Sequence, residues 1–237
     1  MRQFKDNLRR NQKEKQDLEN MRSKTHHHYM KRNRKSTKKK RSRENSGDDS
    51  DSDNDGDATI KVSRNHIYFW CDVTKSSALE LTLKIKDACH DVRNLTVFGD
   101  DPTPVYVHLN SYGGDLDAAL GVVDTIESLK SRGATIITIV EGNVASAATM
   151  ISVVGSERRI RPNACMRVHN FTTGIFGKKN ELDEEFANLE QLETVLVDFY
   201  KNHTTMSRPQ IKRLMAREMD LRVDECLEKG LVDKIQL

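Results

Sequence analysis

Two polar residues stand where a predicted strand gives way to another element, and their types suit acyl-transfer chemistry. Ser146 follows a β-branched run and a short turn, and it precedes an apolar helix. A hydroxyl at that junction feels the positive end of the helix dipole, and neighbouring backbone N–H groups can hold an oxyanion. His169 ends a short predicted strand and is the candidate general base. Taken alone, Ser146 is more typical of a helix N-cap, and His169 of a structural or solvated histidine.

A glycine pair and an acidic segment add two features to this set. Gly113 and Gly114 follow a predicted strand and precede a helix, where glycine lets the backbone approach a ligand and direct its N–H groups outward. A tight turn between strand and helix is the structural alternative. Asp220 ends the segment Glu218-Met219-Asp220, for which a solvated loop acid is the alternative. Together these features are a glycine turn, a serine, a histidine and an acid, each near the end of an element.

The rest of the folded region alternates between strand and helix patterns. Runs of β-branched and aromatic residues predict strands at 66–70, 105–109, 135–140, 164–169 and 231–235. Apolar residues at helical spacing predict helices at 79–91, 116–126, 147–154, 180–202 and 224–229, and a capping box formed by Ser207 and Gln210 opens one more. Strands alternating with helices imply parallel βαβ crossovers, and therefore an α/β fold.

Charge divides the chain into two parts. The 237 residues carry 39 Lys+Arg and 36 Asp+Glu, of which 17 basic and 11 acidic side chains lie in 1–58. Nine Lys/Arg lie in 31–43 and six Asp in 48–57, with few apolar residues, so 1–58 is predicted to be a disordered charged tail or propeptide. Residues 59–237 form the predicted folded domain. Because that domain is slightly acidic, nucleic-acid binding is not predicted.

Sequence signals for a membrane, an export pathway or a metal site are missing. No apolar run approaches the ~20 residues that span a bilayer, and the N-terminus lacks the apolar core of a secretory signal. The four cysteines include no Cys-x-x-Cys pair, which argues against a zinc site or a disulfide framework. We therefore predict a cytoplasmic protein, without membrane association and without a metal or other cofactor.

The ordered motifs resemble those of the proteolytic subunit of the Clp protease, the ClpP family. That family has Asn-Ser-Pro-Gly-Gly after a strand, then a Gly-x-Ala-Ala-Ser nucleophile motif, a Met-x-His base motif, a long helix and a Glu-Tyr-Gly-Leu-Val/Ile-Asp ending. This chain has Asn110-Ser-Tyr-Gly-Gly114, Gly142-Asn-Val-Ala-Ser146, Met166-Arg-Val-His169 and Glu228-Lys-Gly-Leu-Val-Asp233. The resemblance covers about 64–237. It implies a ClpP/crotonase-like spiral of βαβ units with a protruding long helix.

The resemblance implies a role for each matching residue. Ser146 would be the nucleophile, His169 its general base, and Asp220 the acid that orients the imidazole. The backbone N–H groups of Gly114 and Ala147 would form the oxyanion hole.

Three glycines would serve substrate binding by the same resemblance. Gly113 would give the oxyanion turn its freedom. Gly174 and Gly177 fall where the family has a glycine-rich strand that lines the cleft, so that a peptide would bind as an added β-strand.

The implied function is that of an ATP-dependent serine endopeptidase subunit that hydrolyses peptide bonds of unfolded proteins inside a ring-shaped chamber. The implied assembly is a homo-oligomer of heptameric rings, stacked as a tetradecamer through the helix at 180–202. The implied partner is an AAA+ unfoldase of the Clp type.

Departures from the family pattern and other enzyme classes leave alternatives open. Tyr112 replaces the proline of the oxyanion loop, and the segment after Asp220 is shorter than in the family, so Asp224 competes with Asp220 as the acid, although it also suits a helix cap. A crotonase-like acyl-CoA enzyme shares the fold but generally lacks Ser146 and His169 in these places. A catalytically weak ring component and a peptidase with a lysine base are further alternatives.

Overall fold

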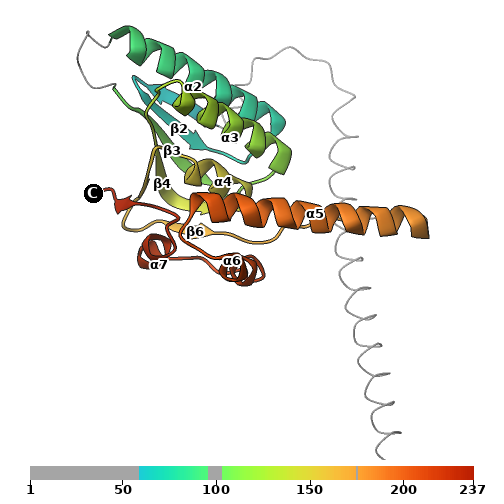
Figure 1. Cartoon of the computed structure of the whole chain (residues 1–237). Helices are drawn as coiled ribbons and strands as arrows, with labels where there is room; N and C mark the ends of the chain where they lie inside the picture. The colour runs from blue at the N-terminus through green and yellow to red at the C-terminus, as the bar shows by residue number, and fades with distance from the viewer. Residues whose placement is uncertain (1–58, 96–102, 175) are drawn as a thin grey trace, which may run out of the picture. The chain divides into compact units, whose positions relative to one another are not determined.

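The computed structural model describes residues 59–95, 103–174 and 176–237 (Figure 1). The charged tail predicted over 1–58 lies outside the described residues and stays a prediction. The described residues form an α/β domain, so the fold class predicted from the alternation of patterns is confirmed.

One seven-stranded sheet organises the domain. Its strand order is β1-β2-β3-β4-β5-β7, and β6 pairs with the far part of β4. β1 and β2 form an antiparallel hairpin, whereas every other pairing of named strands is parallel. The strands are β1 Thr59–Ser63, β2 His66–Trp70, β3 Val105–Ser111, β4 Ile136–Ala145, β5 Glu157–Ile160, β6 Cys165–Arg167 and β7 Lys234–Ile235.

The described helices connect and cover these strands. They are α2 Lys75–Leu95, α3 Leu116–Ser131, α4 Ala147–Val153, α5 Lys179–His203, α6 Arg208–Met215 and α7 Val223–Glu228. α2 and α3 lie side by side over the sheet (Figure 1). The capping box predicted at the start of α6 is confirmed, because the Ser207 N–H donates to Gln210 Oε1 over 2.8 Å. Within the described residues no helix is both long enough and apolar enough to cross a membrane.

Two strands, β1 and β5, were not predicted, and two others, β6 and β7, are shorter than predicted. β1 and β5 were missed because charged residues interrupt them. In β5, Glu157 forms ion pairs with Arg159 and Lys234, and Arg158 forms one with Asp233. The charged residues that made this segment unlike a strand in the sequence therefore form ion pairs within the fold. β7 begins only at Lys234, because Leu231 and Val232 pack into the core on leaving α7.

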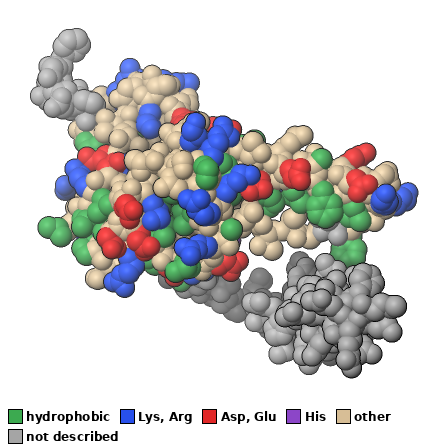
Figure 2. Space-filling model, turned by 60° about the horizontal axis from the view of Figure 1, so that its bottom comes forward, with side chains coloured by type: hydrophobic (Ala, Val, Ile, Leu, Met, Phe, Trp, Pro, Cys, Tyr) green, Lys and Arg blue, Asp and Glu red, His purple; other side chains and the backbone are tan. Residues whose placement is uncertain are grey.

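The core supports the two elements that meet at Ser146. Strand β4 is buried along Ile136–Val140, as its β-branched run predicted, and every residue of α4 is buried. α5 is different, because its buried residues are Leu196, Val197 and Tyr200, all near its C-terminal end. The N-terminal turns of α5 extend beyond the sheet (Figure 1), and Figure 2 shows hydrophobic side chains gathered along this part of the domain. The protruding long helix is therefore confirmed.

Candidate active site

Ser146 occupies the sharp turn between β4 and α4. Its φ of 54° and ψ of −132° lie where residues with a side chain are rarely found, at a cost of about 1–3 kcal/mol. Among the described residues, the other non-glycine residue with a positive φ is Arg64, in the β1–β2 hairpin. The Ser146 side chain makes no capping hydrogen bond to α4. Ser146 thus stands at the N-cap position of α4, as the structural alternative predicted, but its side chain does not cap the helix and the hydroxyl is available for chemistry.

Hydrogen bonds to two neighbouring elements hold this turn in place. The Ser146 N–H donates to the carbonyl oxygen of Arg167 on β6 over 2.9 Å. The Ser146 carbonyl accepts from both the N–H and the hydroxyl of Thr149, at 2.9 and 2.7 Å. Thr149 Oγ1 also lies 2.6 Å from the hydroxyl of Tyr200 on α5, whose pKa burial raises to about 12. The strained serine is therefore fixed from the sheet side and from the helix side.

The glycine pair packs directly against the Ser146 turn. Gly113 has a φ of 96°, and a Cβ built on it would lie 2.6 Å from both the carbonyl oxygen of Ala145 and the Cβ of Ser146. Gly114 has a φ of 141°, and its Cβ would lie 2.2 Å from the carbonyl oxygen of Val73. Glycine is required at both positions by conformation and by space. The structure thus brings Gly113 and Ser146 together, and the oxyanion role of this turn stays a prediction.

Two backbone donors beside Ser146 have no acceptor in the part of the chain that the structure describes. One is the N–H of Gly114, the residue after Gly113, which lies against Ser146. The other is the N–H of Ala147, the first residue of α4. Donors fixed in place before reaction are the requirement for stabilising a developing oxyanion. Gly114 and Ala147 therefore fit the role predicted for them, which stays a prediction.

Replacing Gly113 with alanine is expected to lower kcat by about 100-fold or more and to lower the melting temperature. The added Cβ must displace Ser146 or the Ala145 carbonyl, and loss of one aligned oxyanion donor alone costs about 10²–10³-fold. Gly121→Ala on α3 is the matched control, because its Cβ meets no atom within 4 Å. We expect this control to keep full activity with an equal or higher melting temperature. Equal kcat values for the two variants would contradict the proposed contact.

The pairing of β4 with β6 brings the segment that leads to His169 next to the segment that leads to Ser146. Parallel pairing of β4 with β6 aligns Val144 with Met166 and Ala145 with Arg167. His169 follows two residues after Arg167, whose carbonyl oxygen accepts a hydrogen bond from the Ser146 N–H. Met166 and Val168 are fully buried, whereas Arg167 and His169 are half-buried, so the last two point to the same side. The His169 ring makes no hydrogen bond within the described residues, so its role as the base for Ser146 stays a prediction.

Asp220 is engaged elsewhere. Its Oδ1 accepts a hydrogen bond of 2.7 Å from Nε of Arg167. That hydrogen bond lowers the pKa of Asp220, with partial burial acting in the opposite direction. Nothing in the sequence pattern marked Arg167 as part of the site, and alternation with His169 along the strand is the signal that could have found it. The structure therefore pairs Asp220 with Arg167 and not with the imidazole.

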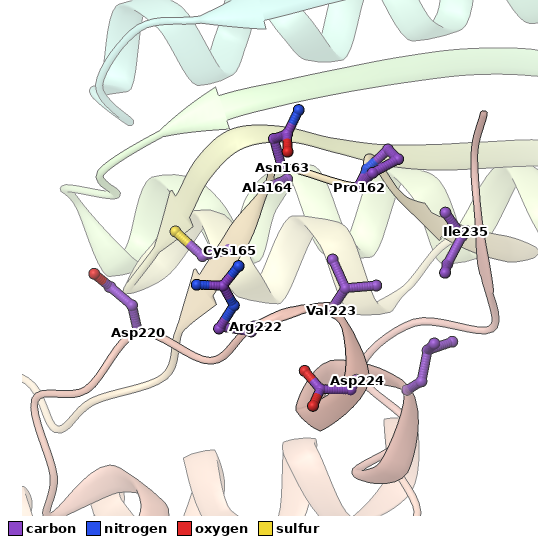
Figure 3. A pocket seen from close by; sticks show the side chains of 10 residues that line it. Pro162, Asn163, Ala164, Cys165, Asp220, Arg222, Val223, Asp224 and Ile235 are labelled. Carbon is purple, nitrogen blue, oxygen red and sulfur yellow. The ribbon is translucent and has the colours of Figure 1, made fainter.

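Asp220 also borders a cavity of about 700 Å³ (Figure 3). Cys165 and Asp220 line one end of it, and Asp224 lines it from the first turn of α7. Asp224 is not a helix cap, since Arg222 occupies that position. Neither Ser146 nor His169 lines the cavity, so it is distinct from the candidate active site.

Gly174 and Gly177 lie in a segment that is not a strand in this single chain. Described residues 170–174 and 176–177 have no regular secondary structure, and Ile175 lies outside the described residues. A strand needs a hydrogen-bonded neighbour, and this segment has none in the sheet. A Cβ on Gly174 would meet no atom within 4 Å, so its surroundings are open. The described residues contain no group of three or more His, Cys, Asp or Glu side chains that could hold a metal ion.

Comparison with known proteins agrees with this geometry. The sequence profile of the Clp protease family matches residues 71–236. The chain is 27% identical over 133 residues to an ATP-dependent Clp protease proteolytic subunit of Deinococcus radiodurans, which covers 55% of this chain and 64% of that relative. It is 32% identical over 134 residues to proteolytic subunit 2 of Treponema denticola, covering 56% of this chain and 66% of that relative.

A third relative matches over a longer span. The chain is 29% identical over 171 residues to the ATP-dependent Clp protease proteolytic subunit 1 of Chlamydia trachomatis, which covers 71% of this chain and 84% of that relative. The match to the first two relatives spans just under two thirds of their length. The seven-stranded α/β domain is consistent with the ClpP fold. With the family profile matching more than half of its residues, the chain belongs to the Clp protease family.

Proposed function

We propose that this chain is a serine-type endopeptidase subunit of the Clp kind, acting on unfolded proteins and peptides. The observation that carries the proposal is the strained Ser146, whose side chain does not cap α4, between two backbone donors that have no acceptor among the described residues. The names of the relatives, all proteolytic subunits of ATP-dependent Clp proteases, support the same activity. We also propose a cytoplasmic location.

The proposed mechanism uses the site in the order in which bonds change. Ser146 Oγ attacks the scissile carbonyl carbon while His169 takes its proton, and the oxyanion binds the N–H groups of Gly114 and Ala147. His169 then gives the proton to the leaving amine, and water hydrolyses the acyl-enzyme by the same route. The acid that holds the imidazole in position is Asp220, with Asp224 as the alternative. The peptide binds as an added strand beside the segment that contains Gly174 and Gly177, where the surroundings of Gly174 are open.

A fluorophosphonate label tests the proposed function directly. The reagent phosphonylates a serine only when a base activates it, so we expect one label per chain at Ser146, located by peptide mass spectrometry. A crotonase-like acyl-CoA enzyme and a ring component without activity both predict an unlabelled Ser146. Absence of the label from the assembled protein would overturn the proposed function.

We propose ring assembly and a Clp-type ATPase partner on the basis of the family and of α5. The first turns of α5 contain no buried residue, yet they carry apolar side chains such as Leu182, Phe186 and Leu189. An apolar stripe on a protruding helix is typical of an interface between subunits. Heptameric rings that stack through α5 into a tetradecamer fit this arrangement.

Replacing Phe186 and Leu189 together with glutamate is expected to convert the stacked assembly into single rings or smaller species. Two charges in an apolar contact must be desolvated without partners, which opposes association. Leu196 is unsuitable for this test because it is buried in the domain core. The charge-matched control is Asn188→Asp with Gln191→Glu, at two exposed polar positions of α5. Identical masses for both double variants in analytical ultracentrifugation would contradict the role of the stripe.

A further inference from the structure

A chain of hydrogen-bonded side chains crosses three neighbouring strands, β2, β3 and β4. Nδ1 of His66 on β2 lies 2.9 Å from Nε2 of His108 on β3, and Nδ1 of His108 lies 2.9 Å from Oε1 of Glu141 on β4. The guanidinium of Arg161 approaches the same Glu141 oxygen, with its Nε at 3.3 Å. His108, in the middle, is only 4% exposed. Side chains therefore join these strands in addition to their backbone pairing.

Aromatic rings and further charged groups surround the two histidines. The His66 ring stacks on Tyr106 with centroids 4.5 Å apart, and the His108 ring stacks on Tyr68 with centroids 4.3 Å apart. The Arg159 guanidinium lies 5.7 Å from the centroid of the Tyr106 ring. The titratable and charged groups on this side of the sheet come from five strands: Lys61 from β1, Tyr68 from β2, Tyr106 from β3, Glu141 from β4, and Glu157, Arg159 and Arg161 from the β5 side.

The carboxylate at one end determines where the protons of this chain lie. The Glu141 carboxylate can only accept, so Nδ1 of His108 carries a proton and donates it. A neutral His108 then has its lone pair at Nε2, which accepts from Nδ1–H of His66. A first added proton, on Nε2 of His66, leaves both hydrogen bonds in place. A second one, on Nε2 of His108, sets two N–H donors against each other over 2.9 Å and breaks the contact.

The chain is attached to an irregular part of β4. The regular pairing of β3 with β4 stops after Leu109 and resumes at Ser111. This interruption contains residues 141–143 on β4 but a single residue on β3, so β4 bulges. Glu141 is the first residue of the bulge, and its hydrogen bond to His108 ties the bulge to β3. The strand then leads directly into the turn that precedes α4.

We propose that His66, His108 and Glu141 form an acid-sensitive latch across β2, β3 and β4, which is closed near neutral pH and opens when both histidines are protonated. The proposal concerns the stability of the sheet and does not depend on the proposed peptidase function. A histidine pair of this kind responds to pH in the physiological range because imidazole titrates there.

The direction of the pH effect follows from counting protons. In the unfolded chain both histidines take up a proton independently, near the ordinary pKa of about 6.5. Burial, and the nearby His108, lower the pKa of His66 in the fold, so below that pH the folded chain binds fewer protons than the unfolded chain. The contribution of the latch to stability is therefore complete above about pH 6.5 and is lost as the pH falls.

Melting curves of the full-length protein between about pH 7.5 and about pH 5, at one protein concentration, compare the wild type with His66→Asn. The asparagine amide donates to Nε2 of His108 when that nitrogen is unprotonated, and turns its oxygen to it when it is protonated. One proton fewer in the folded state changes the unfolding equilibrium constant about tenfold per pH unit, or the melting temperature by about 3–5 °C. Below pH 6.5 we expect the wild type to lose this much per pH unit relative to His66→Asn.

Two further variants separate the latch from general acid destabilisation. His90→Asn removes an exposed histidine of α2, and its pH profile should match that of the wild type. Glu141→Gln keeps an acceptor for His108 but removes the negative charge that favours the first added proton. Its melting temperature should therefore fall more steeply with acid than that of the wild type, by up to about twofold in slope.

Hydrogen exchange followed by mass spectrometry locates the effect in the same full-length proteins. At about pH 5.5 we expect the amides of 105–111 and 136–145 to exchange about tenfold faster in the wild type than in His66→Asn, with equal rates at about pH 7.5. Parallel melting profiles for these two proteins would overturn the latch. A Glu141→Gln profile no steeper than that of the wild type, or an exchange difference absent from β3 and β4, would overturn it as well.

Discussion

Replacing Ser146 with alanine is expected to lower the hydrolysis of a short fluorogenic peptide by about 10⁴-fold or more, with the fold and the assembly intact. The alanine side chain lacks the oxygen that attacks the scissile carbonyl, and no other hydroxyl stands at the turn between β4 and α4. The substitution leaves the backbone bonds from Ser146 to Arg167 and Thr149 in place, because they involve main-chain atoms of residue 146.

Ser152→Ala is the matched control for this experiment. Ser152 lies in α4, the helix that follows Ser146, and its side chain is buried more than one helical turn from the strained junction. We expect this variant to retain turnover even if its stability changes. Wild-type turnover in Ser146→Ala, measured on protein of confirmed mass, would remove Ser146 from the mechanism.

Replacing His169 with alanine is expected to have an effect of similar size, about 10⁴-fold on kcat, because the serine hydroxyl then has no base to take its proton. His90→Ala is the control, since His90 is an exposed histidine of α2 that contacts Asn94. Both variants should retain the wild-type mass.

The same variant decides between two kinds of peptidase. A peptidase that uses a lysine as the base predicts that His169→Ala stays active and that fluorophosphonate labelling of Ser146 continues at the normal rate. The proposed mechanism predicts that the labelling rate falls together with kcat. Retained labelling would assign the proton transfer to another residue.

Much of the fold that carries Ser146 could be predicted, because local patterns determine it. The unbroken β-branched run of β4 and the apolar α4 require burial on all sides, and that alone places Ser146 between a buried strand and a buried helix. The strain at Ser146 could not be predicted. A positive φ is imposed by the packing of Gly113 and by the bonds to Arg167 and Thr149, which come from other elements.

The partner of the acidic residue Asp220 could not be predicted from the sequence. Motif order drew attention to Asp220, but its partner depends on which side chain stands opposite in the bridge between Met166 and Leu221. That register places Arg167 against Asp220, and sequence order contains no such information. The segment with Gly174 and Gly177 is a similar case, because a strand requires a hydrogen-bonded neighbour and the sheet of the described residues offers it none.

The backbone conformation of residue 146 lowers the stability of the domain as long as a serine, the proposed nucleophile, occupies it. Glycine would adopt a φ of 54° and a ψ of −132° without the cost of about 1–3 kcal/mol that serine bears there. The residue that best suits the fold at this position is therefore one that cannot attack a carbonyl. A search for stabilising substitutions would favour glycine at 146 and would obtain a more stable protein without a nucleophile.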